Sequence, residues 1–404
     1  MKNLIIIGKV FPEPNSTAAG SRMIQLMDSF LTQNYQITFL STASISENSF
    51  DLSSKNIQFQ NIILNENSFD ELIKNQNPDV VVFDRFTTEE QFGWRVSEQV
   101  PNAVKILDTE DLHFLRNARE KAFRQNKFLE NSDLINDVFK REMASILRCD
   151  LSLIISEFEM NLLIEKFKFD ENILFYLPLF GEVKKPKTSF PERKNFISIG
   201  NFLHEPNWQT VLQLKKIWKN IKNQLPEAEI HIYGAYASEK VFQLHNEKEG
   251  FIIKGRAENV EYVFNQAKVL LAPIPFGAGI KGKLFESMQF GLPNVTSTVG
   301  AEAMQGNHDW NGFITNNETE FIEKAVLLYQ DENLWQISQE NGFKIIKNRF
   351  KKEFFEPHFI QKIQEISENL ESHRNLNFLG QILQHHTLQS TKYLSKWIEE
   401  KNKK

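Results

Sequence analysis

The sequence predicts an α/β protein with two successive domains, each built on a doubly wound parallel sheet, followed by helices at the C-terminus. Short apolar runs alternate with longer amphipathic segments, which is typical of parallel strands joined by helices. A charged, Pro-containing stretch at residues 181–194 interrupts the alternation, which then restarts. The 404 residues also exceed what one hydrophobic core usually supports. We therefore expect domains at residues 1–180 and 195–350, a linker at 181–194 and terminal helices at 351–404.

The expected strands are runs that are almost entirely apolar, as strands covered on both faces should be. In the first half, these runs lie at residues 4–7, 36–40, 80–83, 104–107, 151–155 and 173–176. In the second half, they lie at residues 195–199, 229–233, 251–254 and 269–273. Apolar residues at helical spacing lie between them, for example at 22–31 and 132–147. No convincing strand follows residue 331, so the end of the chain should be helical.

Composition limits the classes of protein that the chain can represent. Cys149 is the only cysteine, which rules out an intrachain disulfide and favours a reducing compartment. No run approaches the roughly 20 apolar residues of a membrane span, and the apolar run at the start is too short for a signal peptide. A net charge of −5 gives no overall field for nucleic acid. The sequence favours a cytoplasmic protein and leaves open its oligomeric state and a peripheral contact with the inner face of the membrane.

The most informative loop is at residues 273–286, where a strand leads into a glycine-rich turn and a helix expected to begin near Lys281. Glycines let backbone amides approach a phosphate, and Lys281 or Lys283 can add positive charge. Glu286, one turn into the helix, can accept hydrogen bonds from ribose hydroxyls. A glycine turn before an ordinary surface helix would explain the same pattern. The loop residues expected to face a diphosphate are Gly277, Ala278, Gly279 and Ile280.

Five segments of the second half resemble, in order, the retaining glycosyltransferases of family four, the group 1 glycosyl transferases. They are residues 195–207, 226–234, 251–256, 277–293 and 295–303. The resemblance implies a GT-B fold, in which two Rossmann-like domains face a cleft. It also implies transfer of a hexosyl group from a UDP- or GDP-linked sugar with retention of configuration and without a metal ion. No cofactor is expected, because the nucleotide sugar is itself a substrate.

The resemblance also assigns residues to the donor. The lysine and glutamate that hold the diphosphate and ribose in the family map onto Lys283 and Glu286. A second carboxylate, common in the family eight positions earlier, is here Ala278, which puts a carboxylate contact to the donor sugar in doubt. The usual Arg/Lys pair is not evident, and His204 and Asn207 are candidates to replace it, although His204 could equally cap a helix. Further donor-binding residues are expected at Gly20, Arg22, Gly200, Gly234, Gly255 and Arg256.

The first half resembles the family's acceptor domain more weakly. Gly20 would let a helix N-terminus approach the donor phosphates, with Arg22 adding charge, although a plain turn and helix cap is the alternative. In the family, a histidine at the end of such a strand often faces the reacting sugar, so the resemblance makes His113 a catalytic candidate and His113, or Asp108 beside it, a candidate for acceptor contact. The expected acceptor contacts are Asp84, Arg85, Asp108 and Glu110. The alternative for this region is a buried salt-bridge network of Asp84, Arg85, Asp108 and Arg116.

Ser156 and Glu159 are similar to the family's Ser-x-x-Glu helix start, and helix capping explains them without a ligand. At the C-terminus, an apolar series recurs roughly at helical spacing, and we expect this tail to cross back and pack on the first domain. An oligomer contact or a membrane-surface helix is the alternative. The series comprises Phe378, Leu379, Ile382, Leu383, Trp397 and Ile398.

Other chemistries fit the sequence less well. No His, Cys, Asp or Glu cluster has zinc spacing, so we expect no metal site. A dehydrogenase or NTPase loop does not follow the first strand. The family resemblance instead implies hexosyl transfer to a glycan, lipid-linked or small-molecule acceptor, as in polysaccharide biosynthesis. A sugar-nucleotide epimerase of the same fold and an inactive, donor-binding subunit of a glycan assembly complex remain as alternatives.

Overall fold

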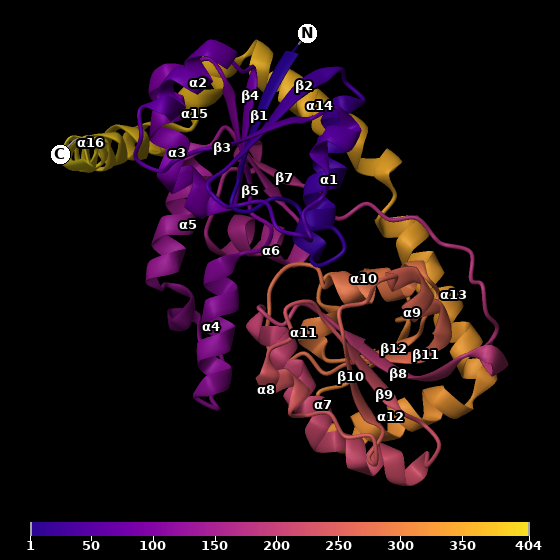
Figure 1. The fold of residues 1–404 in the computed structure, drawn as a ribbon. Coiled ribbons are helices and arrows are strands. Elements are labelled where there is room, and N and C mark those ends of the chain that lie inside the picture. Colours follow the sequence, from indigo (N-terminus) through magenta and orange to yellow (C-terminus); the bar gives the residue numbers. More distant parts are fainter. Residues whose placement is uncertain (1, 403–404) are drawn as a thin grey trace.

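The computed structural model describes residues 2–402, without the side chains of residues 386–389. It contains two parallel β-sheets, each covered by helices on both faces (Figure 1). The first sheet has seven strands in the order β3-β2-β1-β4-β5-β6-β7, and the second has six in the order β10-β9-β8-β11-β12-β13. The predicted fold class of two doubly wound domains with C-terminal helices is therefore confirmed.

The first domain is formed around strands whose alternate side chains enter two different cores. Leu4 and Ile6 pack in one core, whereas Ile5 and Ile7 pack in the other. This is the geometry that a fully apolar strand requires. The strands are β1 (Lys2–Gly8), β2 (Tyr35–Ser41), β3 (Gln58–Asn61), β4 (Val80–Asp84), β5 (Val104–Asp108), β6 (Leu151–Ile154) and β7 (Leu174–Tyr176). The helices are α1 (Ala18–Leu31), α2 (Ser68–Gln76), α3 (Phe86–Gln99), α4 (His113–Arg124), α5 (Asp137–Arg148) and α6 (Glu157–Asn161), with short turns at η1 (Leu52–Lys55), η2 (Asn131–Leu134), η3 (Leu162–Lys166) and η4 (Glu171–Ile173).

The second domain repeats this arrangement. Its strands are β8 (Lys194–Ile199), β9 (Ile230–Tyr233), β10 (Phe251–Gly255), β11 (Ala267–Ala272), β12 (Asn294–Thr296) and β13 (Gly312–Ile314). Its helices are α7 (Glu205–Gln224), α8 (Glu239–Phe242), α9 (Val260–Gln266), α10 (Gly282–Gln289), α11 (Thr298–Ala301) and α12 (Glu318–Gln330), preceded by the turn η5 (Phe190–Glu192).

Three strands were not predicted from the sequence. All four residues of β3 are exposed, because this polar strand lies at the edge of its sheet and only one of its sides is paired. The strands β12 and β13 have three residues each, too few for a periodic signal. Pairing defines them: β12 pairs with the longer strand β11, and β13 pairs with β12.

The last four helices lead from the second domain back to the first. They are α13 (Glu332–Arg349), α14 (Lys352–Glu368), α15 (Leu370–Leu376) and α16 (Phe378–Asn402). Ile345 and Ile346 of α13 are buried in the core of the second domain. Phe359, Ile363 and Ile366 of α14 are buried in a core of the first domain, so the chain crosses back there (Figure 1).

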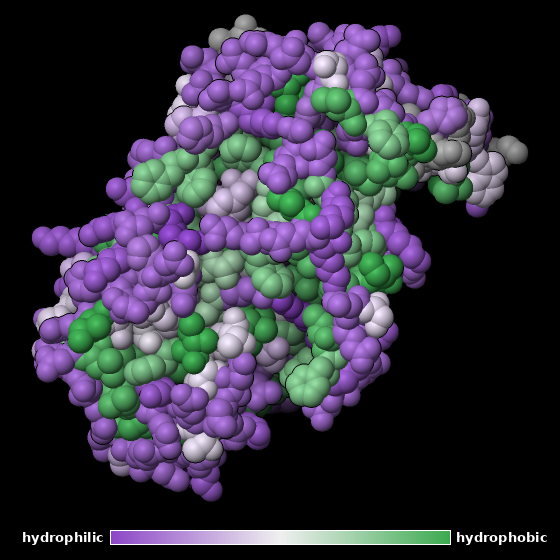
Figure 2. Space-filling model, turned by 180° about the vertical axis from the view of Figure 1, so that it is seen from behind, coloured by the Kyte–Doolittle hydropathy of each residue, from purple (hydrophilic) through white to green (hydrophobic). Residues whose placement is uncertain are grey.

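The tail helix α16 does lie against the first domain, but the structure contradicts the expectation that its apolar series is buried there, since Leu383 and Ile398 are only partly buried. Phe378 and Trp397 are each 61% exposed, and Leu379 and Ile382 are each 51% exposed. The face of α16 that meets the first domain carries polar residues instead, including Ser395, which accepts a hydrogen bond of 2.9 Å from Arg95. Helical spacing places the apolar residues on one face but does not say which face is covered. Figure 2 shows green, apolar side chains where this part of the molecule begins to project. Across the described helices, none is both long enough and apolar enough for a bilayer span.

Candidate functional site

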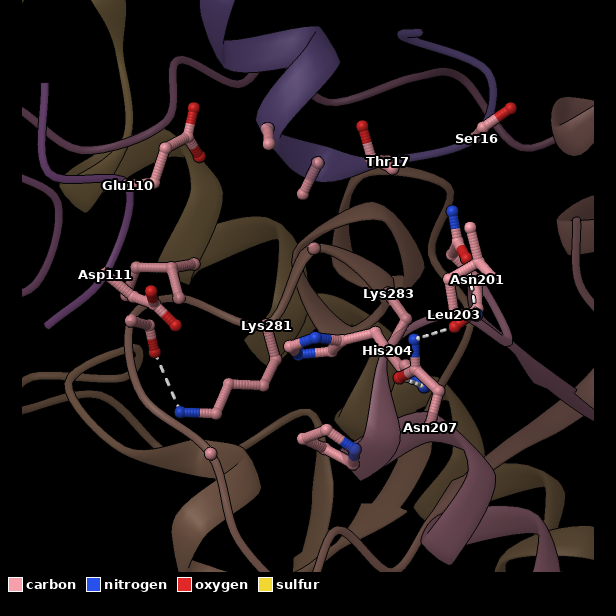
Figure 3. Close-up of a pocket in the computed structure, with 18 of the residues that line it drawn as sticks. Ser16, Thr17, Glu110, Asp111, Asn201, Leu203, His204, Asn207, Lys281 and Lys283 are labelled. Carbon is pink, nitrogen blue, oxygen red and sulfur yellow. Dashed lines mark hydrogen bonds between the residues drawn. The ribbon is translucent and has the colours of Figure 1, made fainter. Parts of the chain in front are cut away.

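A cleft of about 570 Å³ lies where the carboxyl ends of the two sheets face each other (Figure 3). Loops after β1, β4 and β5 form its wall in the first domain, and loops after β8, β9, β10 and β11 form the opposite wall. Parallel sheets bind ligands at this edge because loops and helix N-termini converge there. The predicted site residues that line the cleft are Arg85, Glu110, His113, Gly200, His204, Asn207, Gly234, Arg256, Gly277, Ala278, Gly279, Ile280, Lys281, Lys283 and Glu286.

The other predicted site residues lie outside this cleft. Arg22 is buried, and its Nη2 lies 2.8 Å from Asp108 Oδ1, while its Nη1 donates to the carbonyl of Leu177. Arg22 and Asp108 thus pair with each other within the first domain. The structure does not support the expected contacts of Arg22 with the donor and of Asp108 with the acceptor. Gly20 and Asp84 border a separate, smaller cavity of about 80 Å³, and Gly255 lines neither space.

Two helix N-termini meet at the cleft, one from each domain. A Cβ atom added to Gly282, the first residue of α10, would lie 2.5 Å from the Cβ of Ala18, the first residue of α1. Glycine is therefore needed for this close approach. Thr17 caps α1 by accepting a hydrogen bond from the amide of Gly20, whereas the residue before α10, Lys281, makes no side-chain cap. The free amides and aligned dipoles make this a favourable position for an anion.

Lys283 and Glu286 lie one turn apart on α10 at the floor of the cleft. Lys283 Nζ donates a hydrogen bond of 2.8 Å to Asn207 Oδ1, and Asn207 Nδ2 donates one of 2.8 Å to the carbonyl of Asn201 (Figure 3). Burial lowers the pKa of Lys283 to about 7 and raises that of Glu286 to about 7, and each charge partly offsets the effect on the other. An anionic ligand would favour the charged lysine.

His113 begins α4 on the first-domain side of the cleft. Its Nδ1 lies 3.0 Å from the carbonyl oxygen of Asp111 and 3.3 Å from Glu142 Oε1. Glu142, on α5, also accepts the backbone amides of His113 and Phe114, at 3.0 and 2.9 Å. This carboxylate caps α4, whose preceding residue provides no side-chain cap. No sequence signal points to Glu142, because its role depends on packing between two helices.

Charged residues around the first-domain wall form a network, as one sequence-based alternative proposed, but the pairs differ. Arg116 pairs with Asp111, rather than with Asp84 or Asp108. Arg85 Nη1 donates to Asp84 Oδ2 over 3.1 Å. Burial raises the pKa of Asp111, but the attraction of Arg116, His113 and His204 lowers it by more. The pKa of Asp111 is therefore well below its usual range. These carboxylates therefore have partners within the protein.

Glu110 differs from its neighbours. Its backbone is left-handed, with φ of 63°, and its side chain lines the cleft. Burial, together with the nearby charge of Asp108, raises its pKa to about 8. A carboxyl group that is mostly protonated at neutral pH can both donate and accept hydrogen bonds, as recognition of a sugar hydroxyl requires.

His204 occupies the cap position of α7, but its side chain makes no capping hydrogen bond. The capping alternative is therefore wrong. The ring lies at the cleft, where desolvation by the surrounding protein, aided by Arg116, lowers its pKa to about 4. His204 is accordingly neutral at physiological pH. The capping explanation is also wrong for Ser156 and Glu159. Ser156 makes no side-chain cap on α6, and Glu159 accepts the backbone amides of Leu112 and Gly279 instead.

No group of three or more His, Cys, Asp or Glu side chains in the described part of the chain is arranged to hold a metal ion. The polar groups gathered at the cleft are instead suited to a phosphorylated, hydroxyl-rich ligand. Lysine and helix amides can bind phosphate, and carboxyl groups can bind sugar hydroxyls.

Comparisons with known proteins agree with this architecture. Residues 193–331 match the family model described as Glycosyl transferases group 1. No curated protein matches the chain. Solved structures match it over nearly its whole length at low sequence identity.

Sucrose-phosphate synthase from Thermosynechococcus elongatus is 13% identical, with a TM-score of 0.68, and the match covers 91% of this chain and 99% of that one. The pneumococcal O-GlcNAc transferase GtfA, in complex with UDP and GlcNAc, is 14% identical, with a TM-score of 0.67 and coverage of 90% and 99%. HepE of Anabaena, in complex with UDP, is 13% identical, with a TM-score of 0.64 and coverage of 92% and 100%. The chain thus has the GT-B fold of these structures and carries, at residues 193–331, a domain that matches the Glycosyl transferases group 1 model.

Proposed function

We propose that this chain transfers a hexosyl group from a UDP- or GDP-linked sugar to a glycan, lipid-linked or small-molecule acceptor, with retention of configuration. One observation carries the proposal above the others. The Lys283–Glu286 pair and the uncapped N-terminus of α10 lie within the segment that matches the family model, and they face the first domain across a cleft.

In this proposal, the donor diphosphate lies between the N-termini of α1 and α10, where Lys283 neutralises its charge. Glu286 accepts hydrogen bonds from the ribose. These groups stabilise the departing diphosphate in the role that a divalent cation has in other transferases. As the bond from the anomeric carbon to the phosphate oxygen breaks, the acceptor oxygen forms its bond on the same face. The acceptor proton passes to the departing phosphate, so no protein nucleophile is required.

The acceptor would lie against the first domain, near His113, Glu110 and Arg85. The UDP bound to GtfA and to HepE supports a uridine nucleotide as the first candidate donor. Transfer to a lipid-linked acceptor would take place at the inner face of the membrane, where the protein would bind peripherally without spanning the bilayer.

The test begins with thermal-shift measurements against UDP, GDP and ADP. A nucleotide present at 100 times its dissociation constant should stabilise the protein by about 2.7 kcal/mol. The sugar conjugates of the nucleotide that binds are then incubated with acceptor panels, with and without EDTA, and the anomeric configuration of the product is determined by NMR. An inverted product, or activity lost with EDTA and restored by manganese, would contradict the mechanism. Turnover of the donor without an acceptor would favour an epimerase, and tight binding without any turnover would favour an inactive subunit.

A further inference from the structure

The glycine loop of the second domain is held on both sides by residues of the first domain. Arg119 Nη1, on α4, donates a hydrogen bond of 2.8 Å to the carbonyl of Gly277. Glu159 Oε1, on α6, accepts one of 2.9 Å from the amide of Gly279. Between them, Ala278 packs against a hydrophobic core of the first domain. The conformation of this loop therefore depends on the neighbouring domain.

Glu159 is fully buried, and its Oε1 also accepts the amide of Leu112 at 3.0 Å. Leu112 directly precedes α4 and follows the acceptor-side residues Glu110 and Asp111. One carboxyl oxygen thus joins the loop on the donor side to the loop on the acceptor side. Its other oxygen, Oε2, is buried without a hydrogen-bond partner among the described residues. Burial, and then the charge of Asp111, raises the pKa of Glu159 to about 8, so the carboxyl is mostly neutral at pH 7.

Arg119 is itself held in place. Its two terminal nitrogens form hydrogen bonds of 2.8 and 2.6 Å with the two carboxylate oxygens of Glu302, in the second domain. Its guanidinium also lies 5.2 Å from the centre of the Phe158 ring. A bidentate pair fixes both position and orientation, which a single contact to Gly277 would not do.

The loop also needs glycine at the point of contact. Gly279 has a φ of +62°, and a Cβ atom there would lie 2.9 Å from the Cβ of Asp111. The close approach to the first domain therefore requires glycine at this position, whose own amide is donated to Glu159 and is not available to a phosphate. Neither Arg119 nor Glu159 lines the cleft, so both act on a ligand only through the loop.

We propose that Arg119 and Glu159 are positioning residues, which hold the glycine loop in its binding conformation and link it to the acceptor-side loop at Leu112. The identity of the loop's ligand, a nucleoside diphosphate, rests on the proposed function. The arrangement makes donor binding in the second domain dependent on contacts supplied by the first.

Two measurements test this in the full-length protein with the variants Glu159→Ala, Glu159→Gln and Arg119→Ala. The first is hydrogen–deuterium exchange of peptides covering residues 276–284. The second is the dissociation constant of UDP and of GDP by calorimetry. Arg124→Ala is the matched control, because Arg124 also joins the domains, through an exposed contact of 3.1 Å with Glu205, but does not touch the loop.

We expect Arg119→Ala to speed exchange in the loop and to weaken nucleotide binding by about tenfold or more, the effect of losing one charge-assisted hydrogen bond. Glu159→Ala should have a similar effect, because it leaves two buried backbone amides without their acceptor. Glu159→Gln should behave as the wild type, since its amide oxygen can accept the same two hydrogen bonds. Arg124→Ala should change neither quantity. If Glu159→Ala does not fold, Arg119→Ala decides alone, because its side chain is partly exposed and its removal leaves no cavity in a core.

Wild-type exchange in the loops of both alanine variants would overturn the inference. Equal effects in Arg124→Ala would also overturn it, because they would show a general loss of domain contact. A wild-type protein that binds neither UDP nor GDP would instead contradict the proposed donor class. In that case the exchange data still decide whether Arg119 and Glu159 hold the loop.

Discussion

Lys283 and Glu286 are the side chains on which the proposed donor site depends most directly. Both face the cleft, and each has a pKa near 7, so either can lose its charge when its partner is removed. Replacement of one should therefore affect ligand binding more than folding.

We predict that Lys283→Ala and Glu286→Ala each weaken the binding of the donor nucleotide by about 1.5–3 kcal/mol, the usual contribution of a hydrogen bond to a charged group. Calorimetric titration gives the affinity, and thermal melting shows that the fold is retained. Lys254→Ala, which removes an exposed lysine outside the cleft, is the control. Unchanged affinity in both cleft variants would show that the donor binds elsewhere.

The pKa of Lys283 also predicts a pH dependence. The lysine is charged below about pH 7 and neutral above it. The terminal phosphate of the nucleotide, with a second pKa of about 6, is already ionised in this range. Nucleotide affinity should therefore fall between about pH 7 and 8, by up to about tenfold per unit.

Lys283→Arg provides the comparison, because arginine stays charged throughout this range. Its affinity should be nearly constant from pH 7 to 8 on calorimetric titration. The same slope in the variant and the wild type would assign the titration to another group.

Among the secondary-structure elements, α15 and α16 show how terminal helices stay attached when most of their apolar residues are exposed. Arg374 of α15 binds both carboxylate oxygens of Asp150, at 2.7 and 2.8 Å, and donates to the carbonyl of Ala103. Asp150 is 3% exposed and accepts the amide of Lys105 as well. The attachment is therefore polar, specific and partly desolvated.

We expect Arg374→Ala to lower the free energy of unfolding by about 2–3 kcal/mol, because it leaves Asp150 buried without its counter-charge. Urea denaturation measures this change. Lys392→Ala, which removes the more exposed pair between α16 and Glu98, should cost less than about 1 kcal/mol. Equal losses in the two variants would contradict the special role of the buried pair.

For the whole molecule, stability should respond to the buried carboxyl that joins the two domains. The folded pKa of Glu159, about 8, is above its unfolded value of 4.5. Between these values the folded state keeps a proton that the unfolded state has released. The free energy of unfolding therefore falls as pH rises through this window, and the loss ends above about pH 8.

We predict that wild type loses stability relative to Glu159→Gln from pH 5 to 8, with a limiting slope of about 1.4 kcal/mol per pH unit. Urea denaturation across this range, with the difference between the two proteins taken at each pH, isolates Glu159 from other titrating groups. A constant difference would mean that Glu159 is ionised in the folded state.

Local patterns in the sequence were enough to determine much of the fold and part of the site. The apolar runs at β1, β4 and β5 must be covered on both faces, so they predict a parallel sheet without any knowledge of contacts. The glycine loop before α10, with Lys283 and Glu286 one turn apart, is likewise a local feature. Each of these predictions depends on residues that are close together in the chain.

Only the tertiary structure decided how distant charges are shared. Arg22 pairs with a residue 86 positions away, and Glu159 holds an amide 120 positions away. Many acidic and basic residues could form such pairs, and nothing in their local spacing selects one. The same holds for α16, whose periodicity defines an apolar face but not the surface that it meets. Long-range packing selects among combinations that are locally equivalent, which is why the glycine loop at the cleft was predictable and the residues that contact it from the first domain were not.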